Sequence, residues 1–315
     1  MIKALGMFSG GLDSLLAAKI IQEQSIEVEL VNFYTAFFPP KSAVEMAEQI
    51  KMPLKVIDVT SDYLKMLRRP KHGYGSGMNP CIDCKIFMLR KAKKYAKKIG
   101  AKFIFTGEVI GERPMSQNRN ALDIIERESG LKGKLLRPLS AKLLTKTKAE
   151  KWIDRNNLLD ISGRRRDRQI ELAKKYGLIY PTPAGGCLLT EKEFAKKLRD
   201  LLKSNKRTTS NDLELLKVGR HFRFEKNKII VGRNEEENNR LVALKQKTDY
   251  VFEVPNIGSP ITLLQGPKTK EAIKKAAQMT ARYSDSKDKE TTVKYGKKSV
   301  TVPNLQSNEI DELRL

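Results

Sequence analysis

Short apolar runs alternate with segments of helical periodicity in the first half of the chain. The runs typical of buried strands cover residues 3–8, 28–33, 54–59 and 102–105. Between them, apolar residues at helical spacing predict helices over residues 13–24, 42–50 and 86–99. Strands that alternate with helices indicate βαβ units, so we expect an α/β fold with a doubly wound, mostly parallel sheet. Ligands of such sheets bind beyond the carboxyl ends of the strands.

The pattern changes after residues 204–212, a polar stretch without apolar periodicity. We expect this stretch to link a first domain over residues 1–203 to a second over residues 212–315. In the second domain, His221–Phe224 and Lys228–Gly232 predict a hairpin. Further strands are predicted over residues 250–254, 260–264, 292–295 and 299–302, and a helix over residues 268–283. The second domain is therefore expected to be a smaller α+β domain.

A glycine-rich turn, Ser9-Gly10-Gly11-Leu12-Asp13-Ser14, stands between the first predicted strand and helix. Such a turn directs backbone N–H groups and the positive end of a helix dipole toward one point, which favours a phosphate group. The hydroxyls of Ser9 and Ser14 add donors, and Asp13 can hold Mg²⁺ beside the phosphates. The spacing differs from Walker A and Rossmann loops. The structural alternative is a polar turn that only caps the helix.

Charge changes this picture, because 61 Lys and Arg residues oppose 37 Asp and Glu, a formal charge of +24. A charge of this size in folded segments indicates a polyanionic partner, and nucleic acid is the expected one. A lysine-rich bias that serves solubility alone is the alternative. No apolar run approaches the length of a membrane span, and the chain opens directly into the first strand. We therefore expect a cytoplasmic protein with no membrane partner.

Cys81 and Cys84 form a Cys-x-x-Cys after the glycine-rich loop 72–80, and Cys187 ends the Gly/Pro-rich loop 180–187. Three thiolates are compatible with a [4Fe–4S] cluster that has one open iron. They are also compatible with persulfide chemistry, in which one cysteine carries sulfur and another resolves it. A zinc ion completed by His72 is a third possibility. Cysteines that are merely buried are the fourth.

The turn Ser9–Ser14 resembles the signature of the PP-loop ATP pyrophosphatases, an adenine nucleotide α-hydrolase-like fold whose members adenylate a substrate. Together with residues 79–85 (NPCIDCK) and 185–187 (GGC), it is similar to the tRNA thiolation branch of that family. By this resemblance, Cys84 stands at the catalytic cysteine of the tRNA 2-thiouridylases and Cys187 at the distal one. Cys81 replaces an aspartate, as in cluster-dependent members such as the archaeal-type 4-thiouridine synthases.

The resemblance implies ATP-dependent thiolation of a tRNA uridine to 4-thiouridine or 2-thiouridine, with ATP, Mg²⁺ and a [4Fe–4S] cluster. The implied catalytic residues are Asp13, Cys84 and Cys187, and the implied cluster ligands are Cys81, Cys84 and Cys187. The implied nucleotide-binding residues are Ser9, Gly10, Gly11, Asp13, Ser14, Thr106 and Gly107. Glu108, Ser116 and Gln117 are weaker candidates at the same strand end. The expected partners are tRNA and a sulfur donor, either sulfide or a cysteine desulfurase system, and a homodimer could divide tRNA binding and catalysis between subunits.

The second domain resembles the NFACT-R domain, which is associated with RNA binding. Residues 229–234 (IIVGRN), 249–252 (DYVF) and 281–284 (ARYS) carry this resemblance. We expect Arg233, together with a basic run in the first domain, to contact RNA; the run comprises Arg164, Arg165, Arg166 and Arg168. Competing functions are a PP-loop amide ligase or small-molecule thiolase, and an RNA-binding factor without catalysis.

Overall fold

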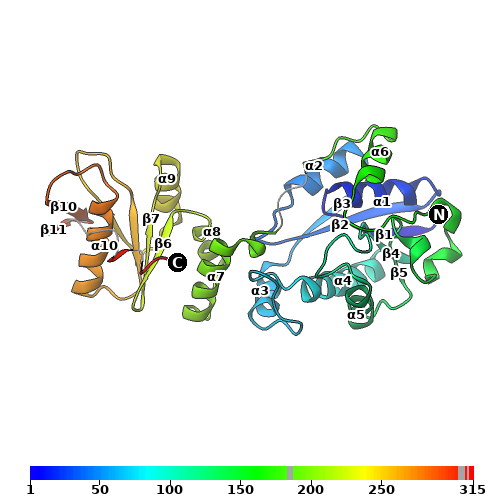
Figure 1. The fold of residues 1–315 in the computed structure, drawn as a ribbon, viewed down its shortest axis with the longest axis horizontal. Coiled ribbons are helices and arrows are strands. Elements are labelled where there is room, and N and C mark those ends of the chain that lie inside the picture. Colours follow the sequence, from blue (N-terminus) through cyan, green and yellow to red (C-terminus); the bar gives the residue numbers. More distant parts are fainter. Residues whose placement is uncertain (183–186, 304–308, 311) are drawn as a thin grey trace. The chain divides into compact units, whose positions relative to one another are not determined.

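The computed structural model describes residues 1–182, 187–303, 309–310 and 312–315. The chain divides into two compact units, Met1–Thr190 and Glu191–Leu315 (Figure 1). This division lies earlier than the predicted linker, because helix α7 (Lys192–Ser204) is held to strand β6 (Arg220–Phe224) of the second unit. The Nε of Arg223 in β6 donates to Oδ1 of Asp200 in α7 at 2.9 Å.

The first unit contains the predicted parallel sheet. Among the described residues its strands are β1 (Lys3–Met7), β2 (Glu27–Tyr34), β3 (Leu54–Asp58), β4 (Phe103–Thr106) and β5 (Leu135–Leu136). Their order is β3-β2-β1-β4-β5, and every pair is parallel. The chain leaves β1 toward β2 on one side and later returns to β4 on the other side. The carboxyl ends of β1 and β4 thus meet where the strand order reverses, as the doubly wound prediction requires.

Helices cover both faces of this sheet, with α1, α2 and α6 on one face and α3, α4 and α5 on the other (Figure 1). Their bounds are α1 Leu12–Gln22, α2 Lys41–Gln49, α3 Thr60–Arg68, α4 Cys81–Lys98, α5 Arg119–Ser129 and α6 Asp167–Lys175. Short 3₁₀ helices cover Ala141–Leu143, Lys148–Lys151, Arg155–Asn157 and Leu188–Thr190. The predicted helix over 86–99 begins five residues earlier, at Cys81, so the Cys-x-x-Cys lies on α4 rather than in the loop before it.

The second unit is an antiparallel sheet with helices on both faces. Its described strands are β6, β7 (Asn227–Val231), β8 (Tyr250–Glu253), β9 (Thr262–Gln265), β10 (Glu290–Tyr295) and β11 (Lys298–Pro303), in the order β11-β10-β8-β9-β7-β6. Helix α10 (Lys270–Arg282) covers one face. Because side chains alternate along a strand, Ile229 and Val231 pack in the cluster with α10, whereas Ile230 packs with Leu241 of α9 (Glu235–Leu244) on the other face.

Two helical segments of the second unit were not predicted. The stretch expected to be a linker, residues 204–212, includes the start of α8 (Ser210–Leu215). A capping box forms this start, because Thr209 and Asp212 exchange hydrogen bonds at 2.8 and 3.2 Å. Helix α9 similarly begins at the Asn234 cap, between the predicted hairpin and the strand predicted from residue 250, where no element was predicted. None of the described helices combines the length and apolar character needed to cross a bilayer.

Gly6, in the central strand β1, provides a test of the packing between the sheet strands. A Cβ at this position would lie 2.5 Å from the ring of Phe105, which is 1% exposed. We expect Gly6→Ala to destabilise the protein by about 1–3 kcal/mol through overpacking. The smaller side chain of Phe105→Leu relieves this clash, so the double variant should lose less than the sum of the two single variants in urea unfolding. Additive losses would contradict this account.

Candidate active site

The glycine-rich turn closes on itself before α1. Gly10 has a φ of 77°, and a Cβ there would lie 2.4 Å from the backbone of Ser42, so only glycine fits. Gly11 occupies the N-cap of α1, and its carbonyl accepts a hydrogen bond from Ser14 Oγ at 2.8 Å. Ser9 is exposed, and its hydroxyl lies 3.4 Å from that of Ser14. The first N–H groups of α1 have no acceptor within the helix, so this turn can receive an anion.

The end of β4 lies against this turn. Thr106, the last residue of β4, is buried, and Gly107 follows it. A Cβ on Gly107 would come within 2.5 Å of the backbone carbon of Asp13 and 2.6 Å of the backbone nitrogen of Ser14. The structure therefore brings together two predicted nucleotide-binding segments that are far apart in the sequence.

Asp13 projects from the first turn of α1 into a charged and partly buried setting. Its Oδ2 lies 3.4 Å from the guanidinium of Arg166, which also contacts Glu112 Oε1 at 2.5 Å. Its Oδ1 is buried, and the side-chain amide of Gln169 lies near the carboxylate. Burial, with the nearby carboxylate of Glu112, raises the pKa of Asp13 to about 6, although Arg166 and Gln169 oppose the rise. A buried carboxylate beside an anion-binding turn is suited to a hard cation such as Mg²⁺.

The four arginines predicted to contact RNA occupy different surroundings. Arg164 and Arg165 are exposed, and Arg168 is exposed and pairs with Asp160 at 2.8 Å. Arg166 is half-buried against Asp13 and Glu112, so it belongs to the surroundings of the glycine-rich turn. In the second unit, Arg233 is exposed and pairs with Glu237.

Cys81 and Cys84 lie on the first turn of α4, and the loop before it is held by side chains of the same motif. Asn79 Oδ1 accepts from the backbone N–H of Gly77 at 3.1 Å, while Asn79 Nδ2 lies 3.2 Å from Cys81 Sγ. Asp83, which is buried, accepts from the backbone N–H groups of residues 71 and 72 at 3.0 and 2.8 Å. These contacts fix the two sulfurs at the start of the helix.

The distal cysteine reaches the same loop through the backbone. The N–H of Met78 donates to the carbonyl of Leu189 at 2.8 Å, and the carbonyl of Cys187 accepts from the N–H of Thr190 at 2.7 Å. A Cβ on Gly77 would lie 2.3 Å from the Leu189 carbonyl oxygen, so glycine is needed for this approach. Gly185 and Gly186 of the predicted motif lie outside the described residues.

Tyr63 of α3 lies near the three cysteines. The sequence patterns did not identify this residue as part of the site. The side chain is 1% exposed, and its hydroxyl hydrogen-bonds Cys84. Burial raises the pKa of Tyr63, and the sulfurs of all three cysteines raise it further, so each lies within electrostatic range of the hydroxyl. The rings of Phe87 and Phe38 pack edge-on against Tyr63 at 5.8 and 5.4 Å and fix its position.

A buried ion-pair network connects the cysteine helix to the nucleotide-binding strand. Glu108 directly follows Gly107, and its carboxylate lies 3.0 Å from Arg137 Nε and 3.3 Å from Nζ of Lys85, the residue after Cys84. Burial opposes ionisation, yet Lys85 and Arg137 lower the pKa of Glu108 to about 2. Arg137 is itself buried and also pairs with Glu126. Glu108 therefore acts as a charged link between the two predicted sites.

The zinc alternative requires His72 beside the cysteines. Within the described residues, no three His, Cys, Asp or Glu side chains are grouped to hold a single metal ion. His72 Nε2 lies 3.3 Å from Glu128. A [4Fe–4S] cluster makes a different demand, because each thiolate binds a different iron.

Burial of the thiol raises the pKa of Cys84, and the hydroxyl of Tyr63 opposes this rise. We expect Tyr63→Phe to leave Cys84 less ionised and to slow its alkylation about fivefold, the effect of losing a hydrogen bond of roughly 1 kcal/mol. The measurement is the iodoacetamide rate against pH, in a chain whose Cys81 and Cys187 are replaced by serine. An unchanged rate would show that the hydroxyl does not stabilise the thiolate.

The raised pKa of Asp13 also predicts a pH-dependent stability. Its ordinary value is 3.8, so the folded protein binds this proton more tightly than the unfolded chain between about pH 4 and pH 6. The ionised carboxylate is therefore unfavourable to folding, and the effect is complete above pH 6. We expect Asp13→Asn to stabilise the protein by about 1–3 kcal/mol at pH 8 and by less at pH 5. Thermal unfolding at both pH values tests this, and a pH-independent difference would contradict it.

Comparison with known proteins relates this chain to enzymes that carry sulfur to tRNA. It is 28% identical over 147 residues to a probable tRNA sulfurtransferase of Thermococcus kodakarensis, which covers 44% of this chain and 36% of the relative. It is 26% identical over 129 residues to the tRNA-specific 2-thiouridylase MnmA of Deinococcus radiodurans, which covers 34% of this chain and 33% of the relative. The chain thus spans about a third of the length of these two curated relatives.

A solved structure described as a 4-thiouridine synthetase–RNA complex with bound ATP aligns with a TM-score of 0.38 and 22% identity, over 68% of this chain and 52% of that chain. Residues 219–314 match the family described as the NFACT protein RNA binding domain. Residues 2–176 match the family described as thiamine biosynthesis protein (ThiI). This match covers more than half of the chain and includes the glycine-rich turn and the Cys-x-x-Cys, so the chain belongs to the ThiI family.

Proposed function

We propose that the protein is an ATP-dependent tRNA thiolation enzyme, which adenylates a uridine carbonyl and replaces its oxygen with sulfur. One observation carries the proposal: the anion-binding turn and the cysteines are joined by a short series of contacts. The backbone of Asp13 lies against Gly107, and Glu108 is the next residue after Gly107. The carboxylate of Glu108 forms an ion pair with Lys85, which follows Cys84. Adenylation takes place at the carbonyl oxygen and sulfur transfer at the carbon that bears it, so the reaction needs both sites close together.

The turn supplies the groups that ATP requires. The N–H groups at the start of α1 and the hydroxyls of Ser9 and Ser14 bind the phosphates, with Gly10 and Gly11 allowing close approach. Asp13 would hold Mg²⁺ through its buried carboxylate, and the ion would supply positive charge beside the phosphates. Thr106 and Gly107 form the adjacent wall of the nucleotide site. Arg166 holds Asp13 in place and lies where it can contact a phosphate.

The reaction consists of two nucleophilic substitutions, the first at the α phosphorus of ATP and the second at the carbonyl carbon of the base. The uridine carbonyl oxygen attacks the α phosphorus of ATP, which forms an O–P bond and releases pyrophosphate. A sulfur nucleophile then attacks the activated carbon, the carbon–oxygen bond breaks, and AMP leaves with that oxygen. To reach these groups the uridine must leave its stack in the tRNA. The product is 4-thiouridine or 2-thiouridine, according to the carbonyl presented.

Cys81, Cys84 and Cys187 are the proposed ligands of a [4Fe–4S] cluster. Cys81 and Cys84 lie on the first turn of α4, the backbone of residues 187–190 contacts the loop before that helix, and thiolates are the preferred ligands of such clusters. A cluster with three protein ligands would supply an open iron for sulfide. The chain's own groups position the sulfurs: Asn79 holds Cys81, and Tyr63 hydrogen-bonds Cys84. In the alternative, a persulfide on Cys187 or Cys84 supplies the sulfur.

The second unit supports tRNA as the substrate, because its sequence matches an RNA-binding family and the chain carries a formal charge of +24. Arg233 and the exposed Arg164, Arg165 and Arg168 are the proposed contacts to the RNA backbone. Sulfide or a cysteine desulfurase system as sulfur donor, a homodimer and a cytoplasmic location remain predictions.

Anaerobic purification followed by iron and sulfide counts tests the cluster. We expect roughly four irons per chain in the unaltered protein and loss of iron in Cys81→Ala, because one of three ligands is removed. Ser14→Ala is the matched control: it alters the nucleotide turn, so it should keep its iron. Both variants should lose thiolation of an unmodified tRNA transcript with ATP and sulfide, measured by mass spectrometry of the nucleosides.

The outcomes separate the two chemistries. An unaltered protein that is iron-free under strict anaerobiosis, yet thiolates tRNA when cysteine and a cysteine desulfurase replace sulfide, with Cys81→Ala still active, would replace the cluster with persulfide chemistry on Cys84 and Cys187. A protein that holds iron but neither releases AMP nor modifies tRNA would contradict the proposed function itself.

A further inference from the structure

The second unit contains a pocket of about 130 Å³ whose walls carry cationic side chains from four segments. Lys197 comes from α7, Arg220 from β6, Arg233 from the turn after β7, and Arg314 from the segment beside β6. The acidic side chain in the lining is that of Glu193, which is exposed. A bound water needs roughly 10–15 Å³ of volume open to its centre, so the pocket has room for a group of several heavy atoms.

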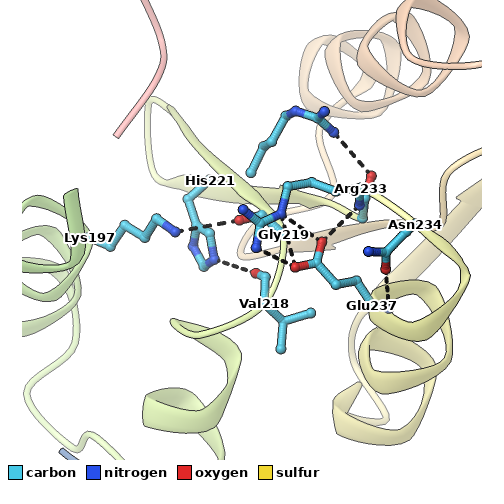
Figure 2. Close-up of polar contacts among 9 residues, drawn as sticks. Lys197, Val218, Gly219, His221, Arg233, Asn234 and Glu237 are labelled. Atoms are coloured by element: carbon cyan, nitrogen blue, oxygen red, sulfur yellow. Dashed lines mark hydrogen bonds and ion pairs between the residues drawn. The ribbon is translucent and has the colours of Figure 1, made fainter. Parts of the chain in front are cut away.

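Backbone carbonyls next to β6 and β7, and the ring of Tyr283, position the cations of the pocket. Lys197 extends from α7 toward the carbonyl of Gly219, with a Nζ–O distance of 3.5 Å (Figure 2). Arg220 lies over the ring of Tyr283 at 4.7 Å and reaches the carbonyl of Gly232 at 3.4 Å. Arg314 is placed beside β6 by its bridge to Phe222.

Arg233 differs from the other three cations, because a carboxylate compensates its charge. Glu237, which is 8% exposed, accepts from the backbone N–H and the Nε of Arg233 at 2.9 Å (Figure 2). Asn234 caps the same helix and accepts from the N–H of Glu237 at 2.9 Å. In the described part of the chain, no carboxylate forms an ion pair with Lys197, Arg220 or Arg314.

The lining thus combines four cationic side chains with the carboxylate of Glu193 and the last residue of the sequence, Leu315, which carries the terminal carboxylate. With Glu237 paired to Arg233, positive charge remains in excess. Burial lowers the pKa of Lys197, and the guanidinium groups of Arg233 and Arg314 lower it further against the opposing carboxylates of Glu193 and Glu237. Cations held together in a partly buried pocket repel one another, and an anion bound between them removes that penalty. Guanidinium groups match the oxygens of a phosphate, to which they donate two hydrogen bonds at once.

We infer that this pocket binds a phosphate group of RNA, with Lys197, Arg220 and Arg314 as its ligands and Arg233 held at the rim by Glu237. The inference rests on the proposed function in taking RNA as the partner. The phosphate can be an internal diester of the RNA strand or a terminal monoester, because both present phosphate oxygens to the same cationic groups.

The test measures binding of an unmodified tRNA transcript to the full chain without ATP. Fluorescence anisotropy gives the affinity across a range of KCl concentrations. Lys197→Gln combined with Arg314→Gln should weaken binding roughly tenfold and reduce the slope of log affinity against log salt by about 1. The matched control, Lys196→Gln with Arg199→Gln, removes two exposed charges from α7 that do not line the pocket. The inference is overturned if both double variants, equally stable in thermal unfolding, show the same affinity and slope.

Two further arms identify the phosphate and separate this inference from the proposed function. Two single-stranded oligonucleotides, one with a 5′-hydroxyl and one with a 5′-phosphate, are compared in the Lys197→Gln/Arg314→Gln variant. If the variant weakens binding of both equally, the pocket binds an internal diester. If it weakens binding of the 5′-phosphorylated form alone, the pocket binds a terminal monoester. Pocket-dependent binding by a protein that does not thiolate tRNA would refute only the proposed function. Full tRNA affinity in Lys197→Gln/Arg314→Gln, with thiolation intact, would refute only the pocket.

Discussion

The first unit depends on one buried carboxylate, that of Glu108. Removing a charge from water costs several kcal/mol unless partners compensate it, and a buried pair that loses one partner destabilises a protein by about 3–5 kcal/mol. Glu108 is 3% exposed and has Lys85 and Arg137 as partners. Because Lys85 belongs to the cysteine helix and Glu108 to the end of β4, electrostatic attraction fixes the distance between two elements that the hydrophobic core alone would leave adjustable.

Glycines set the other short distances in this unit. Gly10 allows the turn to approach the backbone of Ser42, Gly107 allows β4 to approach Asp13, and Gly77 allows the cysteine loop to approach Leu189. At each position a Cβ would lie under 3 Å from a backbone atom, so any other residue would separate the two segments. The glycines thus permit close backbone contacts because they have no Cβ, whereas the charged network holds its elements together by electrostatic attraction. Both arrange the groups of one site before any substrate binds.

The sequence predicts the parallel sheet because hydrophobic periodicity alone separates buried strands from amphipathic helices. It misplaces the start of the cysteine helix, since the glycine-rich loop before Cys81 gives no periodic signal and Pro80 can precede a first turn as readily as continue a loop. It also passes over α9, whose first turn consists of three glutamates and whose apolar residues fall mostly in the last turn. The sequence signal for this helix is the Asn234 cap, which was used only for the NFACT-R resemblance.

Some residues of the site can be recognised from local sequence patterns, whereas the role of others depends on tertiary contacts. Ser9–Ser14 and the cysteines have local signatures, but nothing around Tyr63 distinguishes it from any aromatic residue on a helix, because its role depends on α4 packing beside α3. Charge has the same limitation. The basic run 164–168 is conspicuous in the sequence, yet Arg166 is paired with Asp13 and Glu112, and Arg168 with Asp160.

Lys197, Arg220 and Arg314 lie far apart in the sequence and have no acidic partner among the described residues. A cation near an anion-binding site is informative when the fold has gathered it with others and left it uncompensated, and that property is tertiary. Net charge identifies the class of partner, whereas the pattern of unpaired charge identifies where the partner binds.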